Sequence, residues 1–353
     1  MEMHGLAQSL RQRVPWSVAS RILKEQQLPR GQGWDRTVER LCSGDYQDAN
    51  TIAGLQAALR EHILYGEKLV RIYDLDEKKN SAVEIIQNVK IKQTSFAKRF
   101  PETLPEDELT DTSAEPVLVY VEESDEAVSA VFASVRAMQL RESVPTDEIP
   151  DEAKGILGNY DEVVGIKNVR YEAFDVISIS RKSPRAVVLI DHPLGASKDS
   201  GVAAHTQIVH CFSKIVGQNI LSQPINLFPL INAMYRARSE GVVVELAFGT
   251  STASLKHEKM RRKSLCLREE AYHKGGKAAL STPIEPHRLS IIWRRPLASG
   301  GSSAPELSLH TTTTIAGSPL PVLWEAEIRK CIGVDDFSYV NSRIEYFLSQ
   351  KKK

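Results

Sequence analysis

Apolar residues recur at helical intervals in three successive segments of the first 65 residues. These segments begin near Val14, Trp34 and Asp48, and Pro15 suits the start of the first helix. Lys68–Tyr73 then alternates apolar and polar side chains, as a short strand does. Three helices followed by a strand are typical of a small winged-helix-like module, which we expect at the N-terminus.

Beyond residue 115 the apolar pattern predicts an irregular mixture of strands and helices. We expect strands over 117–121, 163–169, 173–179, 186–190, 242–248 and 288–293, and a β-prone run over 307–315. Helices are expected over 124–140, 201–217, 225–239, 255–271, 321–331 and 336–349. This order favours an α+β fold over regular βαβ winding. The chain should therefore carry a helical N-terminal module and a larger mixed β-sheet domain with flanking helices.

Two connectors divide the chain. Residues 101–115 and 142–152 are rich in proline and acidic side chains. A chain of 353 residues also exceeds the usual size of a single hydrophobic core. We expect a helical module over 1–100, an acidic connector with one strand and one helix over 101–160, and an α+β domain with a basic surface over 161–353.

Charge is segregated along the chain, although its formal net charge is zero. Residues 101–175 hold 19 acidic and 5 basic side chains, whereas residues 176–353 hold 14 acidic and 24 basic ones. Clustered charges attract partners of the opposite charge. An acidic loop resting on the basic surface, within one molecule or between subunits, is one hypothesis.

The densest basic cluster spans residues 256–277, with eight Lys and Arg against three acids. Clustered cations bind a phosphate backbone by displacing its counterions. If strands 242–248 and 288–293 are neighbours, the arginines after Trp293 would join this cluster. Trp293 is interpreted either as a base-stacking residue or as core. The expected nucleic-acid contacts are Lys256, Lys259, Arg261, Arg262, Lys263, Arg268, Lys274, Lys277, Arg294 and Arg295.

No catalytic motif predicts a reaction. A metal-dependent nuclease would need two acids and a lysine at the ends of adjacent strands. Asp191 and Glu245 are the only candidates we identify, and the residues after Glu245 lack the lysine. The N-terminal helices suggest a helix-turn-helix, but the turn at 28–33 is longer than usual. Nucleotide-binding loops, metal-ligand spacings and cofactor motifs were not found.

Four widely spaced cysteines, no signal-like start and no long apolar run favour a soluble, reduced protein of the cytoplasm without a membrane span. The leading hypothesis is a non-catalytic nucleic-acid-binding component of a multi-protein assembly, such as an antiviral defence or DNA-processing complex. The alternatives are a divergent metal-dependent nuclease and an adaptor whose basic face binds an acidic protein. A protein partner or a homo-oligomer is also expected, and the sequence indicates no cofactor.

Overall fold

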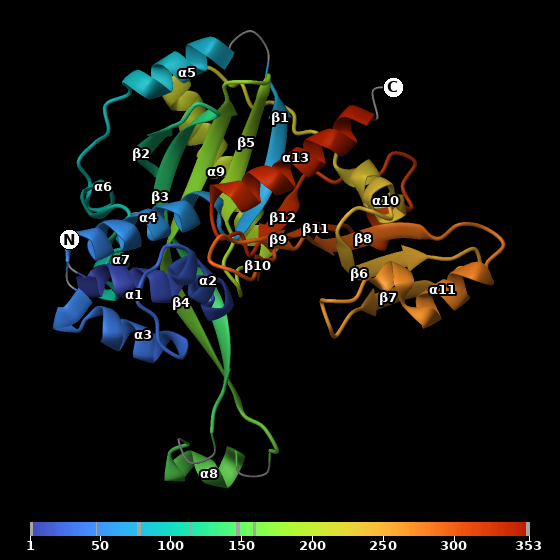
Figure 1. The fold of residues 1–353 in the computed structure, drawn as a ribbon, viewed down its shortest axis with the longest axis horizontal. Coiled ribbons are helices and arrows are strands. Elements are labelled where there is room, and N and C mark those ends of the chain that lie inside the picture. Colours follow the sequence, from blue (N-terminus) through green and yellow to red (C-terminus); the bar gives the residue numbers. More distant parts are fainter. Residues whose placement is uncertain are drawn as a thin grey trace.

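The chain folds around one large antiparallel sheet with helices on both faces (Figure 1). The computed structural model describes residues 3–46, 48–75, 79–112, 114–145, 149–157 and 160–350. The α+β class and the helical N-terminal part are confirmed. No helix in these described ranges is long and apolar enough to cross a membrane.

The helices occur along the whole chain. Within the described residues they are α1 (Met3–Arg13), α2 (Trp16–Glu25), α3 (Gly33–Leu41), α4 (Ala49–Tyr65), α5 (Lys79–Asn88), α6 (Ser95–Arg99), α7 (Glu106–Asp111), α8 (Asp151–Leu157), α9 (Lys198–Val216), α10 (Phe228–Arg236), α11 (Ala271–Ala278), α12 (Thr313–Ala316) and α13 (Val334–Gln350), with 3₁₀ turns η1 (Gly44–Tyr46) and η2 (Leu267–Glu269).

Side-chain caps fix where the long helices begin. Asp48 accepts hydrogen bonds from the backbone N–H groups of Asn50 and Thr51 at the start of α4. Ser197 caps α9 in the same way, and α9 ends at Gly217 with a left-handed φ of 76°. These short polar side chains satisfy N–H groups that the first helical turn leaves unpaired, and glycine adopts the left-handed conformation without steric cost.

The large sheet takes strands from nearly the whole chain. Its members are β1 (Lys68–Asp74), β2 (Val117–Glu123), β3 (Ala127–Ser143), β4 (Val164–Ser180), β5 (Arg185–Asp191), β6 (Val242–Gly249), β7 (Leu255–Lys259), β8 (Glu285–Ile292), β11 (Glu306–His310) and β12 (Ala326–Arg329). The order is β2-β3-β4-β5-β1-β12-β11-β8-β6-β7, and β9 (Arg295–Pro296) pairs separately with β10 (Ser302–Ser303). Because β1 lies between β5 and β12, the N-terminal helices have no separate wing of their own.

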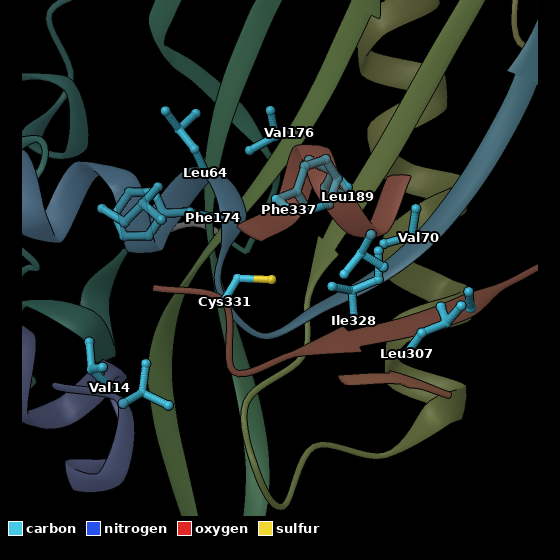
Figure 2. Packing of buried hydrophobic residues seen from close by; sticks show 14 of the residues in the cluster. Val14, Leu64, Val70, Phe174, Val176, Leu189, Leu307, Ile328, Cys331 and Phe337 are labelled. Atoms are coloured by element: carbon cyan, nitrogen blue, oxygen red, sulfur yellow. The ribbon is translucent and has the colours of Figure 1, made fainter. Parts of the chain in front are cut away.

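The two sheet faces are buried under different helices. One face packs against α4, α10, α13 and the other N-terminal helices, and Figure 2 shows part of this cluster around Phe174, Leu189, Ile328 and Phe337. On the other face α5 and α9 cover β1, β5, β4 and β3. The larger cluster draws on all three sequence ranges that we separate at residues 100 and 160, and the division into domains stays a prediction.

Three expected helices are strands in the structure. The segment 124–140 belongs to β3, whose Ala130 and Phe132 face one helical layer while Val131 and Ala133 face the other. A strand buried on both faces has an almost continuous apolar run, which a helix can also have. The segment 321–331 contains β12, a four-residue strand between β1 and β11.

The expected basic helix at 255–271 is also wrong. Its first part is β7, which lies at the edge of the sheet and is mostly exposed. An edge strand that is solvated on both faces needs no apolar alternation, so its charges resemble a helix surface. The segments 163–169 and 173–179, expected as two separate strands, both belong to β4, which pairs with β3.

Candidate functional site

The strand order brings together two basic segments that are distant in sequence. β6 pairs with β8, with Val242 opposite Ile292, so the expected adjacency of these strands is confirmed. β7 lies on the other side of β6, and the N–H of Met260 donates to the carbonyl of Val244. The chain therefore leaves β7 toward the same end of the sheet at which β8 ends. Arg261 and Arg262 follow β7 there.

An ion pair fixes this loop at the end of the sheet. The Lys263 Nζ lies 3.1 Å from Glu306 Oε2, and Glu306 is paired with Ile292 in the β11–β8 ladder. Arg294 follows Ile292 by two residues and is exposed. We define the basic sheet end as the four exposed residues Arg261, Arg262, Lys263 and Arg294.

Most of the charge at the basic sheet end is not neutralised. Among the described residues, no carboxylate lies within ion-pair distance of Arg261, Arg262 or Arg294. Glu306 is shared between Lys263 and Lys330, which also pairs with it. Three guanidinium groups at one end of the sheet therefore remain available to an anion.

Several other predicted contacts have acidic partners instead. Lys259 lies 3.2 Å from Glu245, and Lys274 lies 3.1 Å from Glu269. Arg295 pairs with Asp336 at 3.1 Å. These cations are balanced within the chain, so we assign them no part in the candidate site.

Lys256 and Lys277 lie away from the basic sheet end. Lys256 is exposed on β7 opposite Phe248, toward the other end of that strand. Lysines on a short edge strand also keep it from pairing with other chains. Lys277 donates to the Tyr235 hydroxyl at 3.0 Å and lies over its ring. Both residues have a structural explanation.

Arg268 is buried rather than presented to solvent, with 7% of its surface exposed. Its guanidinium donates to the carbonyls of Ala237, Glu240 and Gly241, the last at 2.9 Å. These three carbonyls follow the C-terminus of α10, so Arg268 holds the turn between α10 and β6. It does not belong to the exposed basic group.

Replacing Arg268 by methionine should lower the free energy of unfolding by about 2 kcal/mol, because buried carbonyls lose their donors. The salt dependence of nucleic-acid binding should stay unchanged. Urea unfolding and a binding titration measure the two quantities. Weaker binding with unaltered stability would show that Arg268 contacts phosphate after all.

Trp293 is core, not a base-stacking platform. Only 5% of its surface is exposed, and its indole N–H donates to Glu240 Oε1 at 3.0 Å. Two arginines near the turn between the N-terminal helices are also engaged locally. Arg30 donates to the Ser20 carbonyl and Arg40 to the Arg30 carbonyl, which holds the turn between α2 and α3.

The two acids considered for a nuclease cannot share a metal ion. Asp191 ends β5 and Glu245 lies in β6, with β1, β12, β11 and β8 between them. Five strand spacings of about 4.8 Å separate them by roughly 24 Å. Glu245 is also held by His257, Lys259 and Arg288. Within the described ranges no group of three potential ligands could hold a metal ion.

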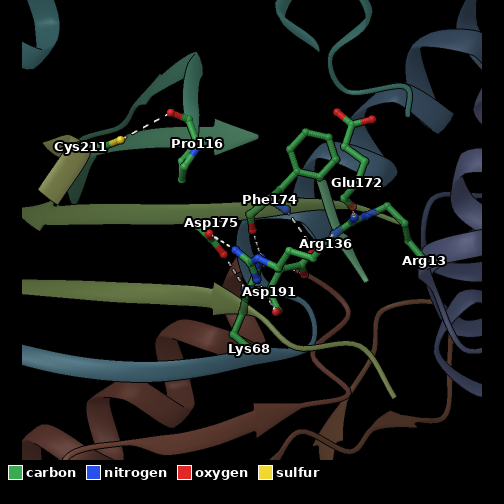
Figure 3. A network of polar contacts seen from close by, with 9 residues as sticks. All are labelled: Arg13, Lys68, Pro116, Arg136, Glu172, Phe174, Asp175, Asp191 and Cys211. Carbon is green, nitrogen blue, oxygen red and sulfur yellow. Dashed lines mark hydrogen bonds and ion pairs between the residues drawn. The ribbon is translucent and has the colours of Figure 1, made fainter. Parts of the chain in front are cut away.

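Asp191 is instead the centre of a buried ionic network (Figure 3). Its carboxylate accepts from Arg13 at 2.7 Å, from Lys68 at 3.3 Å and from the N–H of Phe174 at 3.0 Å. Burial alone would raise the pKa of this carboxyl, but Arg13 and Lys68 outweigh it and hold the pKa well below its usual range. The network ties α1 to β1, β4 and β5.

A second ion pair extends this network within the sheet. Arg136 on β3 pairs with Asp175 on β4, and its guanidinium also donates to the Asp191 carbonyl at 3.1 Å. Asp175 in turn accepts from the N–H of Asp191 at 2.9 Å. Sequence reasoning missed the network, although a charged residue inside the apolar run 173–179 was a signal for it.

A cavity of about 300 Å³ adjoins this network between α1, α7 and the base of β3 and β4. Most of its polar groups are already paired: Arg13 with Asp191, Glu67 with Arg329, and Arg170 with the Thr110 carbonyl. Its other walls include apolar side chains such as Leu109, Met138 and Val169. We place the function at the basic sheet end instead, where three exposed guanidinium groups have no acidic partner among the described residues.

Among the described residues, Arg13, His62 and Glu172 in the wall of this cavity each have a buried polar atom without a hydrogen-bond partner. The Oε2 of Glu172 accepts from the N–H of Leu104 at 2.6 Å, whereas its buried Oε1 has no hydrogen-bond partner. Burial raises the pKa of this carboxyl to about 7, against the opposing effects of the Leu104 N–H and the Arg13 guanidinium. Glu172 therefore holds a proton under conditions in which an exposed glutamate has lost it.

Comparisons of the chain with models of protein families, with curated proteins and with solved structures found no match.

Proposed function

We propose that this protein binds the phosphate backbone of nucleic acid through its basic sheet end, without catalysing a reaction. The observation that carries the proposal is the convergence of Arg261, Arg262 and Arg294, all exposed and without a described ion-pair partner, at one end of the sheet. Guanidinium groups donate in a planar fork that matches phosphate oxygens.

The arrangement favours positioning on the backbone over reading of bases. Trp293 beside the arginines is buried, so it offers no surface for stacking. Contacts to phosphate carry no direct sequence information. We therefore expect similar affinities for different sequences of one kind of nucleic acid.

The cellular context that we propose is a component of a larger DNA-processing or defence assembly in the cytoplasm. The four cysteines, at positions 42, 211, 266 and 331, form no disulfide in the described chain, as is usual in a reducing compartment. Because the sequence contains no catalytic motif that we identify, we propose that this component contributes by binding.

A titration against nucleic acid over a salt series tests the proposal. Three or four phosphate contacts predict a slope of log K against log[salt] of about −3, because each contact contributes roughly −0.9 with duplex DNA. Reversing charge with Arg261→Glu and Arg262→Glu together should reduce the magnitude of this slope by about 2.

The matched control reverses two exposed lysines elsewhere, Lys90→Glu with Lys92→Glu, and should leave the slope unchanged apart from a small general effect of net charge. A flat slope for the wild-type protein would rule out phosphate binding. If no nucleic acid is bound even at low salt, an adaptor that binds an acidic protein replaces our proposal.

A further inference from the structure

The two longest strands extend well past the rest of the sheet. β2 pairs with β3 only as far as Ala133, and β5 pairs with β4 only from Val176 onward. Ser134–Ser143 and Val164–Ala173 therefore pair only with each other. Ten residues in a strand span about 33 Å. Figure 1 shows this hairpin leaving the body of the molecule and ending in α8.

The end of this hairpin exposes large apolar side chains. Ile156, Tyr160, Val164 and Ile166 are 75%, 61%, 49% and 59% exposed. A two-stranded hairpin on its own is at best marginally stable in water. Neighbouring exposed apolar side chains are characteristic of contact surfaces. We call residues 149–166 of this hairpin the arm tip, as far as the structure describes them.

The arm tip is also acidic. Residues 149–166 contain four Asp and Glu and one Lys. Asp161 and Glu162 are exposed and have no ion-pair partner among the described residues. Its charge is therefore opposite to that of the basic sheet end, and Tyr160 beside these acids is suited to lie against a guanidinium group.

The arm and the basic sheet end lie at the same end of the hydrogen-bonded ladder, although the sheet twists strongly between β4 and β8 (Figure 1). At the base of the arm, the N–H of Phe174 donates a hydrogen bond to the carboxylate of Asp191, which ends β5. Asp191 is paired with Lys68, which begins β1. The ladder continues through β12 to Glu306, which is opposite Ile292 at the end of β8. All these positions lie at one end of the strands.

An arm tip cannot reach the basic sheet end of its own molecule. The continuous β3–β4 ladder keeps the arm extended, and Figure 1 shows α8 at its end well apart from β6, β7 and β8. A second copy can receive the tip. Because each copy carries both surfaces, a twofold axis would make two equal contacts.

We propose that two copies of this chain form a symmetric dimer in which each arm tip docks on the basic sheet end of the other copy. The acids Asp161 and Glu162 meet Arg261 and Arg262, and the apolar residues of the tip lose contact with water. The dimer and nucleic acid then compete for the same arginines, so added polyanion should dissociate the dimer.

Light scattering coupled to size exclusion, at low salt and micromolar protein, tests the dimer. The wild type should have twice the chain mass of 39.3 kDa. Asp161→Lys with Glu162→Lys, and separately Arg261→Glu with Arg262→Glu, should each weaken dimerisation at least tenfold. The four substitutions together restore opposite charges and should restore the dimer. Lys90→Glu with Lys92→Glu is the control and should remain dimeric.

Two results would overturn the dimer: a monomeric wild type at 100 μM, or a four-substitution variant that is no more dimeric than its parents. Reversing the tip charges should leave nucleic-acid binding intact, since the arginines are unchanged. A monomer that keeps its salt slope thus contradicts only the dimer. A dimer without affinity for nucleic acid contradicts only the proposed function.

Discussion

Replacing Asp191 by asparagine is expected to lower the free energy of unfolding by about 3–5 kcal/mol, the usual cost of breaking a buried ion pair. The carboxylate neutralises two cations, Arg13 and Lys68, which are 8% and 0% exposed in their side chains. Asparagine is of similar size but carries no charge. Both cations would then stay buried with less compensation, which is costly in an interior of low polarity. Urea denaturation, followed by circular dichroism, measures the loss.

A surface pair provides the matched control for this substitution. Glu123 and Arg181 form an ion pair of 3.0 Å with half-exposed side chains. Glu123→Gln should change the unfolding free energy by at most about 1 kcal/mol, because water screens such pairs. If Asp191→Asn costs no more than Glu123→Gln, the buried network contributes little to the stability of the sheet.

Replacing Glu172 by glutamine should remove a pH dependence from stability. The folded protein raises the pKa of Glu172 to about 7, whereas the unfolded chain leaves it near its ordinary value of 4.5. The folded state therefore binds the proton more tightly. The contribution of this group is fully present below about pH 4.5 and is lost as the pH rises through 7, with a total loss of about 3 kcal/mol.

Urea denaturation at a series of pH values measures this effect as a difference between the two proteins. Glutamine still accepts from the Leu104 N–H, but it cannot ionise. The two unfolding free energies should agree near pH 4.5, and Glu172→Gln should be more stable by about 3 kcal/mol at pH 8. A difference that does not vary with pH would mean that Glu172 is already ionised at acid pH in the folded protein.

The sequence predicts correctly those elements whose apolar pattern fits either a helix or a strand but not both. α9 and α10 lie near their expected positions, as do the strands β5, β6 and β8. For β3, β7 and β12 the observed strand differs from the expected helix, because in these segments the pairing and burial of the neighbouring elements decide the secondary structure. β3 is covered by helices on both faces, β7 has a partner on one side only, and β12 is inserted between strands from distant parts of the chain.

The candidate site could be predicted in part for the same reason. The sequence indicates β6 and β8 as two strands but leaves their adjacency a condition; the structure shows that they pair, which places Arg294 near the basic loop. The burial of Arg268 depends on three carbonyls about 30 positions earlier. The contact of Arg13 with Asp191 spans 178 positions. Local patterns contain no information about such contacts.

The position of β12 has a consequence for synthesis of the chain. β1 acquires its β5 partner once residue 191 has been made, and residues 224–225 then bond to Ile72 and Tyr73 on its other edge. Lys68–Val70 remain unpaired on that edge until residues 326–329 emerge, 135 positions after residue 191 (326 minus 191). At about 5–20 residues per second, a ribosome needs roughly 7–27 s for that interval. Until β12 is made, the nascent chain presents this unpaired part of β1, which is the kind of edge that recruits other chains. Chaperone demand should therefore be highest just before β12 closes the sheet.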